Sequence, residues 1–138
     1  MAFVLDCSVV LAWIFPDEAT EATHRLLDSL VDGRAFAPAL WPVEVANVLL
    51  VATRRGRIDA DEWEQLYANL EALPIEIDPV SPSRVWGKTL QLAHAHRLSV
   101  DDAMYLELAL RMRLPLATLD RALGEAGRME GLETPASA

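Results

Sequence analysis

Residues 2–16 read Ala-Phe-Val-Leu-Asp-Cys-Ser-Val-Val-Leu-Ala-Trp-Ile-Phe-Pro. The short apolar run Ala2–Leu5 ends at an acidic residue, Asp6, and this predicts a buried strand. Ser8–Phe15 is typical of a helix, and Pro16 ends it because proline lacks the N–H group that a continuing helix needs. The stretch therefore predicts a strand–helix unit that carries a carboxylate where the strand ends.

The same alternation of strands and helices continues along the chain. Three further short apolar runs predict strands at Ala35–Ala37, Ile75–Ile77 and Leu116–Thr118. Apolar residues at helical spacing, caps and breakers predict helices at Glu18–Val31, Val43–Arg55 (with Pro42 in the first turn), Ala60–Ala72, Ser83–His96, Val100–Met112 (capped by Ser99) and from Asp120 through Ala126. Such alternation favours an α/β fold, a three-layer sandwich with a short, mostly parallel central sheet flanked by helices.

Length and composition indicate one domain with a substantial core. The chain has 138 residues, of which 52% are hydrophobic. We expect the domain at residues 1–132 and a flexible C-terminal tail at residues 133–138. No apolar run reaches the roughly 18–20 residues of a membrane span, and the N-terminus lacks the basic region of a signal peptide. With a single cysteine, Cys7, these features predict a cytoplasmic protein without a membrane partner.

The charge of the chain argues against nucleic acid as a partner. The formal net charge is −9, whereas phosphate contacts need lysine and arginine. The densest basic cluster is Arg54, Arg55 and Arg57, which we interpret first as charges that suit a helix C-terminus and alternatively as contacts for an acidic partner segment. The chain also lacks the glycine-rich motifs of Rossmann and P-loop nucleotide sites.

Acidic and hydroxyl residues gather at one edge of the predicted sheet. They are Asp6, Glu44, Asp101, Asp102 and Asp120, with Ser8 and Thr118 beside two of the acids. Ligand sites in parallel sheets lie at the carboxyl ends of the strands, so we expect these side chains to meet there. Each acid alone has a structural explanation, as a helix cap or as a charge that favours a helix dipole.

The convergence of several carboxylates predicts a divalent cation. Two unit charges 4 Å apart repel each other by about 4 kcal/mol at an effective dielectric constant of 20. Oxygen ligands suit the hard ions Mg²⁺ and Mn²⁺, and such an ion can activate a water molecule for attack on a phosphodiester. Asp101 and Asp102 point about 100° apart on a helix, so only one faces the site squarely, and the spacing leaves both open.

Four segments together resemble the acidic motifs of PIN-domain ribonucleases. They are VLDCSVVLAWIFPDE (4–18), WPVEVANVL (41–49), LSVDDAMYLELALR (98–111) and LPLATLDRAL (114–123). In order and spacing they are similar to the VapC-type toxins of toxin–antitoxin operons, and the resemblance covers nearly the whole chain. It implies a PIN-like fold and a metal-dependent endoribonuclease that serves as the toxin of such a pair.

The resemblance also implies roles for individual residues. Asp6 is the central metal ligand, Glu44 the second acid, Asp102 the third because it directly precedes Ala103, and Asp120 the fourth, acting through water. Ser8 and Thr118 are polar neighbours that hold metal-bound waters, and Asp101 is a substitute ligand at a position where the family commonly has another residue type. The implied cofactor is Mg²⁺, with Mn²⁺ as the alternative. The implied partners are RNA, an antitoxin protein that blocks the site, and a second copy in a homodimer.

Two other functions fit the residues less well. A phosphatase or phosphotransferase would use Asp6 as the nucleophile, but the haloacid-dehalogenase pattern requires a second aspartate where this chain has Ser8. A catalytically inactive PIN-like binding module is the other alternative, and the acids at all four motif positions argue against it.

Overall fold

The computed structural model describes residues 1–137, which contain one four-stranded sheet. Its strands are β1 (Ala2–Leu5), β2 (Arg34–Pro38), β3 (Ile75–Asp78) and β4 (Leu116–Ala117), in the order β3-β2-β1-β4. All three pairings are parallel, with Val4 of β1 opposite Phe36 of β2 and Leu116 of β4. β1 is thus an interior strand, as its apolar sequence predicts.

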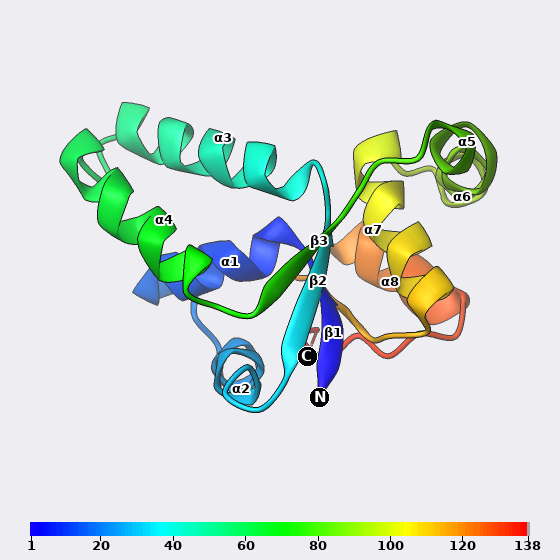
Figure 1. Cartoon of the computed structure of the whole chain (residues 1–138), viewed down its shortest axis with the longest axis horizontal. Helices are drawn as coiled ribbons and strands as arrows, with labels where there is room; N and C mark the ends of the chain where they lie inside the picture. The colour runs from blue at the N-terminus through cyan, green and yellow to red at the C-terminus, as the bar shows by residue number, and fades with distance from the viewer. Residues whose placement is uncertain (138) are drawn as a thin grey trace.

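Helices cover both faces of the sheet, which Figure 1 shows nearly edge-on. One face carries α1 (Cys7–Ile14), η1 (Pro16–Glu18), α2 (Glu21–Ser29), α3 (Trp41–Arg54), η2 (Ala60–Glu62) and α4 (Trp63–Glu71). The other carries α5 (Pro82–Arg84), η3 (Val85–Thr89), α6 (Leu90–His96), α7 (Val100–Met112) and α8 (Arg121–Met129). The predicted three-layer α/β sandwich is confirmed. Within residues 1–137, every helix falls short of the length and apolar character that a bilayer crossing requires.

The connections between strands reverse direction next to β1. The helices that follow β1 and β2 lie on one face and lead outward to β3 at one edge of the sheet. The helices that follow β3 lie on the opposite face and lead back across the sheet to β4 at the other edge. Open α/β sheets bind ligands where such a reversal opens a crevice at the carboxyl ends of the strands. In this chain that crevice lies between the ends of β1 and β4.

The core fixes α7 against the centre of the sheet. α7 packs on β1 and β2, and its Tyr105 and Leu106 are fully buried together with Phe3 and Leu5 of β1. Burial of each large apolar side chain contributes about 1.5–3 kcal/mol relative to exposure. The N-terminus of α7 and the C-terminal end of β1 are therefore held rigidly with respect to each other.

Several predicted helices have different bounds in the structure. The helix expected at Ser83–His96 is divided into α5, η3 and α6, and the one expected at Ala60–Ala72 into η2 and α4. The helix expected at Glu18–Val31 begins later, because η1 turns the chain first and Thr20 then caps α2. The Thr20 and Thr23 side chains bond each other's backbone N–H groups at 3.1 and 2.9 Å, a capping box that lacks the usual glutamate. The last helix, expected to end at Ala126, continues to Met129 and then turns at Gly131, whose φ is 87°.

Residues 133–137, expected to be part of a flexible tail, pack against the domain. The Leu116 N–H of edge strand β4 donates to the Glu133 carbonyl at 2.9 Å, and Ala136 is 3% exposed. The polar, small-residue composition of the segment gave no sign of this, because the contacts use backbone groups and one buried methyl group. Residue 138 of the expected tail lies outside the described residues.

Candidate active site

Asp6 occupies the crevice between β1 and β4. Its backbone N–H donates to the Ala117 carbonyl at 3.0 Å, so sheet pairing fixes the residue that follows β1. Its side chain is 6% exposed, and Oδ2 accepts hydrogen bonds from Ser8 Oγ at 2.6 Å and Thr118 Oγ1 at 2.8 Å. A carboxylate that is this deeply buried and held by two hydroxyl groups has a defined orientation before any ligand binds.

Ser8 and Thr118 join the ends of the two strands into one network. Ser8 Oγ also accepts from the Leu119 N–H at 2.8 Å, and Thr118 Oγ1 accepts from the Asp120 N–H at 3.0 Å. Asp120 in turn caps α8, because its Oδ1 accepts from the Leu123 N–H at 2.9 Å. Asp120 therefore has both the capping role that sequence suggests and a place beside the Asp6 carboxylate.

Glu44 approaches the same crevice from the first turn of α3. Its Oε1 accepts a hydrogen bond from the hydroxyl group of Tyr105, which is fully buried on α7. Tyr105 was not among the predicted site residues. The sequence could have indicated Tyr105 by its spacing, because it lies three residues after Asp102 and therefore on the same side of the helix.

The structure distinguishes between the two adjacent aspartates at the start of α7. Ser99 Oγ accepts from the Asp102 N–H at 3.1 Å, which confirms Ser99 as the cap of this helix. Asp102 is partly buried and is electrostatically coupled to Asp6 and Asp120, whereas Asp101 is exposed. This geometry favours Asp102 as the carboxylate that faces the crevice.

Burial and mutual repulsion raise the pKa values of three carboxyl groups in the crevice. For Asp6 the largest cause is burial, which the hydroxyl groups of Ser8 and Thr118 oppose, with Asp120 adding repulsion. For Glu44 the pKa is raised by burial and then by Asp6, against the hydrogen bond from Tyr105. For Asp102 the pKa is raised by burial and then by Asp120 and Asp6. Asp101 also adds repulsion at Glu44 and Asp102, so the acids of the crevice affect one another's pKa values.

The Cys7 thiol next to Asp6 is not a nucleophile at neutral pH. Burial, followed by the negative charges of Asp6 and Glu44, raises the pKa of Cys7 to about 12. Because the thiolate is the reactive form, this shift keeps the thiol inert.

The donor set of the crevice fits a hard divalent ion that keeps part of its hydration shell. Among residues 1–137, no three side chains of the types His, Cys, Asp and Glu are positioned to coordinate one ion together. This spacing does not oppose Mg²⁺, which is usually held by one or two carboxylates and several waters. Burial and then mutual repulsion raise the pKa values of Asp6, Glu44 and Asp102, and a bound cation would offset the repulsion.

Another acid at a strand end, Asp78, is paired with arginines and does not belong to the acidic crevice. Asp78 ends β3, but its Oδ2 lies 2.6 Å from Arg111 Nη2 and 3.8 Å from Arg84 Nη2. Both arginines also contact the buried carboxylate of Glu107. Two arginines thus balance two acids, and this cluster requires no further ligand.

Comparison with known proteins agrees with the geometry. A profile of the PIN domain matches residues 3–129. The chain belongs to the PIN-domain family. This PIN domain is 32% identical over 139 residues to Ribonuclease VapC3 of Pyrobaculum aerophilum, an alignment that covers 98% of this chain and 100% of that relative. The family that the four acidic motifs resemble is therefore confirmed.

Two solved structures share the fold of this PIN domain. The crystal structure of PAE2754 from Pyrobaculum aerophilum has a TM-score of 0.66 at 23% sequence identity, over 99% of this chain and 82% of that one. The crystal structure of FitAcB from Neisseria gonorrhoeae has a TM-score of 0.53 at 18% identity, over 97% and 96% of the two chains. At such identities the likeness concerns the architecture alone.

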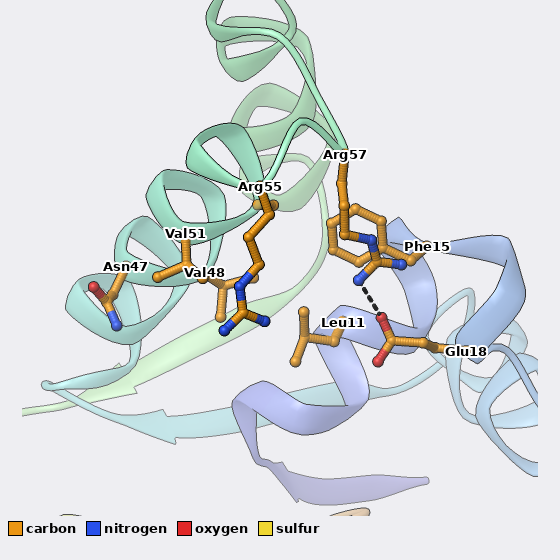
Figure 2. A pocket seen from close by; sticks show the side chains of 9 residues that line it. Leu11, Phe15, Glu18, Asn47, Val48, Val51, Arg55 and Arg57 are labelled. Atoms are coloured by element: carbon orange, nitrogen blue, oxygen red, sulfur yellow. Dashed lines mark hydrogen bonds and ion pairs between the residues drawn. The ribbon is translucent and has the colours of Figure 1, made fainter.

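An apolar groove lies between α1 and α3 of this PIN domain, as Figure 2 shows. It has a volume of about 340 Å³, and Leu11, Val48 and Val51 line it. At one end Arg57 stacks 3.8 Å above the Phe15 ring and donates hydrogen bonds to Asp17 and Glu18. Arg57 therefore closes this end of the groove by joining the α3–η2 turn to η1.

Proposed function

We propose that this PIN domain is a metal-dependent endoribonuclease that hydrolyses RNA phosphodiester bonds and acts as the toxin of a toxin–antitoxin module. The observation that carries the proposal is the electrostatic coupling of Asp6, Glu44, Asp102 and Asp120 at the reversal point of the sheet. Support also comes from a relative named Ribonuclease VapC3 that aligns over its full length. RNA and the protein itself would meet in the cytoplasm.

In this proposal the four acids bind Mg²⁺ or Mn²⁺, in part directly and in part through water molecules. Asp6 is the central ligand, Asp102 and Glu44 complete the acidic side, and Asp120 acts through water because it also caps α8. When bound, the ion lowers the pKa of a coordinated water and stabilises the charge that develops on the phosphate.

The surrounding hydroxyl groups keep the carboxylates in place. Ser8 and Thr118 orient Asp6 by donating to Oδ2, and Tyr105 orients Glu44 in the same way. Hydrogen bonds from these donors also favour the ionised carboxylates, which are the forms that bind a cation. Asp101 is the alternative candidate for the ligand that we assign to Asp102.

The test is cleavage of RNA by the purified, antitoxin-free protein. Total RNA is incubated with Mg²⁺, with Mn²⁺ or with EDTA, using the wild type, Asp6→Asn and the control Asp28→Asn. Asp28 is an exposed aspartate on α2, so its replacement removes the same charge away from the crevice. We expect discrete metal-dependent cuts from the wild type and the control, and none from Asp6→Asn. Equal cleavage by Asp6→Asn would place the metal site elsewhere.

We further propose that the antitoxin presents an apolar, acidic segment to the groove between α1 and α3. Leu11 lies one turn beyond Ser8 on α1, and Val48 lies one turn beyond Glu44 on α3. A segment in the groove would therefore extend toward the crevice and block it. Arg55 also lines the groove and forms no salt bridge within residues 1–137, so it is free to pair with an acidic side chain.

Growth arrest of a bacterial host tests the toxin and antitoxin together. Expression of the wild type is expected to arrest growth, and co-expression of the protein encoded beside this gene is expected to relieve the arrest. Val48→Arg should stay toxic but escape relief, because the new side chain fills the apolar groove. The control is Val43→Arg, on the exposed side of the same helix. Equal relief of both variants would contradict this docking site.

A homodimer is the last part of the proposal. Trp86 and Leu90 are 75% and 51% exposed and stand four residues apart on one helical face. Aromatic residues of this kind are enriched in protein interfaces, which supports this face as the contact between two copies.

A further inference from the structure

A second, larger groove runs along the β4 edge of the sheet, between α2 and α8. Its volume is about 740 Å³. Arg25 of α2 lines one wall, Arg121 and Arg128 of α8 line the other, and residues 135–137 contribute to its lining. Arginines therefore face a common hollow from two helices that are far apart in the sequence.

The groove lies beside the segment that follows β4, which also carries two residues of the acidic crevice, Thr118 and Asp120. Leu119 belongs to its lining, and the Leu119 N–H is hydrogen-bonded to Ser8, the residue that holds Asp6. Arg121 directly follows Asp120, and Ser137 Oγ bonds the carbonyl of Thr118 at 3.3 Å. A chain molecule placed in this groove would therefore lie next to the segment that carries Thr118 and Asp120.

The charge of the groove differs from that of the rest of the molecule. Its lining has three arginines against two acids, Glu21 and Glu125, while the whole chain has a net charge of −9. The two acids pair with arginines on their own helices, Glu21 with Arg25 at 3.1 Å and Glu125 with Arg121 at 3.2 Å. Exposed pairs of this type contribute little to stability, so a phosphate can replace the carboxylate at little cost.

Arg128 is held in place without a carboxylate partner. Its Nη1 donates to Thr134 Oγ1 at 3.0 Å, and within residues 1–137 it forms no salt bridge. The site where a Cβ would stand at Gly124 is 3.4 Å from this guanidinium and 3.3 Å from Ser137 Oγ, so the glycine lets the arginine and the tail pack closely. Arg121 and Arg128 are seven residues apart, about 10 Å along one face of α8.

We infer that this arginine groove binds the RNA strand on one side of the scissile phosphate. The inference rests on the proposed nuclease function and specifies where its substrate lies. A spacing of about 10 Å along the helix is large enough for Arg121 and Arg128 to contact separate phosphates of one strand. Contacts with phosphates are independent of base identity, and the groove therefore supplies affinity and position rather than sequence preference.

The test measures binding of a fluorescein-labelled, single-stranded 12-nucleotide RNA by anisotropy, in EDTA and from 50 to 200 mM salt. The variant is Arg121→Ala/Arg128→Ala. The control, Arg34→Ala/Lys88→Ala, removes the same charge from exposed positions outside the groove. Each lost phosphate contact on a single strand reduces the slope of log K against log salt by about 0.7, so we expect a slope about 1.4 less steep for the groove variant and an unchanged slope for the control.

Cleavage of the same RNA by the wild type with added Mg²⁺ or Mn²⁺ separates this inference from the proposed function. The inference is wrong, and the nuclease stands, if the wild type cleaves and the groove variant binds with the wild-type salt slope. The same conclusion follows if the slope of the control falls as much as that of the groove variant. If the wild type does not cleave but binding depends on Arg121 and Arg128, the groove is supported and the nuclease is not. A wild type that neither binds nor cleaves contradicts both.

Discussion

The hydrogen bond between Tyr105 and Glu44 can be removed by deleting one atom. Tyr105→Phe keeps the ring, which is fully buried, and takes away the hydroxyl group that donates to Glu44 Oε1. The packing of α7 on the sheet is unchanged, so the variant reports on the hydrogen bond alone. Tyr67→Phe is the matched control, because Tyr67 is 46% exposed on α4.

The expected loss follows from the charge of the acceptor. Hydrogen bonds to charged groups contribute about 1.5–3 kcal/mol. We therefore expect the free energy of unfolding of Tyr105→Phe to fall by about 1.5–3 kcal/mol at pH 7.5 in EDTA. For a chain of this size that corresponds to a fall in Tm of about 5–10 °C. Urea denaturation and thermal scans measure both quantities.

The pH dependence distinguishes this cause from a packing defect. Burial raises the pKa of Glu44 above its ordinary value, and the Tyr105 hydroxyl group opposes that shift, so the variant raises the pKa of Glu44 further. The difference in stability between wild type and variant is present where Glu44 is ionised and shrinks as pH falls and Glu44 takes up a proton. A loss below about 0.5 kcal/mol, a loss equal to that of Tyr67→Phe, or a loss independent of pH would refute the argument.

Three further outcomes are expected. Because the pKa values of Asp6, Glu44 and Asp102 are raised in the folded state, the folded protein binds protons that the unfolded chain releases. The free energy of unfolding in EDTA should therefore rise as pH falls from 8 to 5. The rise should be less steep in Asp6→Asn. At 100 times its dissociation constant, Mg²⁺ should stabilise the wild type by about 2.7 kcal/mol in a thermal scan and leave Asp6→Asn unchanged, and equal shifts in both would contradict a site at Asp6. Trp86→Glu should sediment as a monomer of 15.2 kDa while the wild type sediments as a dimer, and a monomeric wild type would rule out the homodimer.

Sequence reasoning identified the elements of the fold better than their ends. Proline, glycine and serine residues predicted where α3 and α7 begin or end, because these residues constrain the backbone locally. The start of α2 was wrong because Thr23 takes the place of the glutamate in its capping box. The packing of residues 133–137 was missed because their contacts depend on an edge strand, β4, whose position along the sheet no local pattern encodes.

The assignment of the site residues stays a prediction, and sequence patterns indicated only part of their arrangement. Strand ends and helix starts indicated which acids share an edge of the sheet, since parallel strands all place their carboxyl ends together. The choice between Asp101 and Asp102 needed the burial that α7 acquires against β1. The hydroxyl of Tyr105 is a long-range partner of Glu44, 61 residues away, and only packing brings the two together.

The sequence by itself determined the strand–helix order, the family motifs and the acids available for a cation, because periodicity, capping and residue chemistry act over a few neighbouring positions. The tertiary structure alone decided the strand order, the coupling among the acids and the gathering of three arginines from α2 and α8 beside them. These depend on distances between segments far apart in the chain. Such distances are set by the burial of β1 between its neighbours and by the crossing of the chain from one face of the sheet to the other.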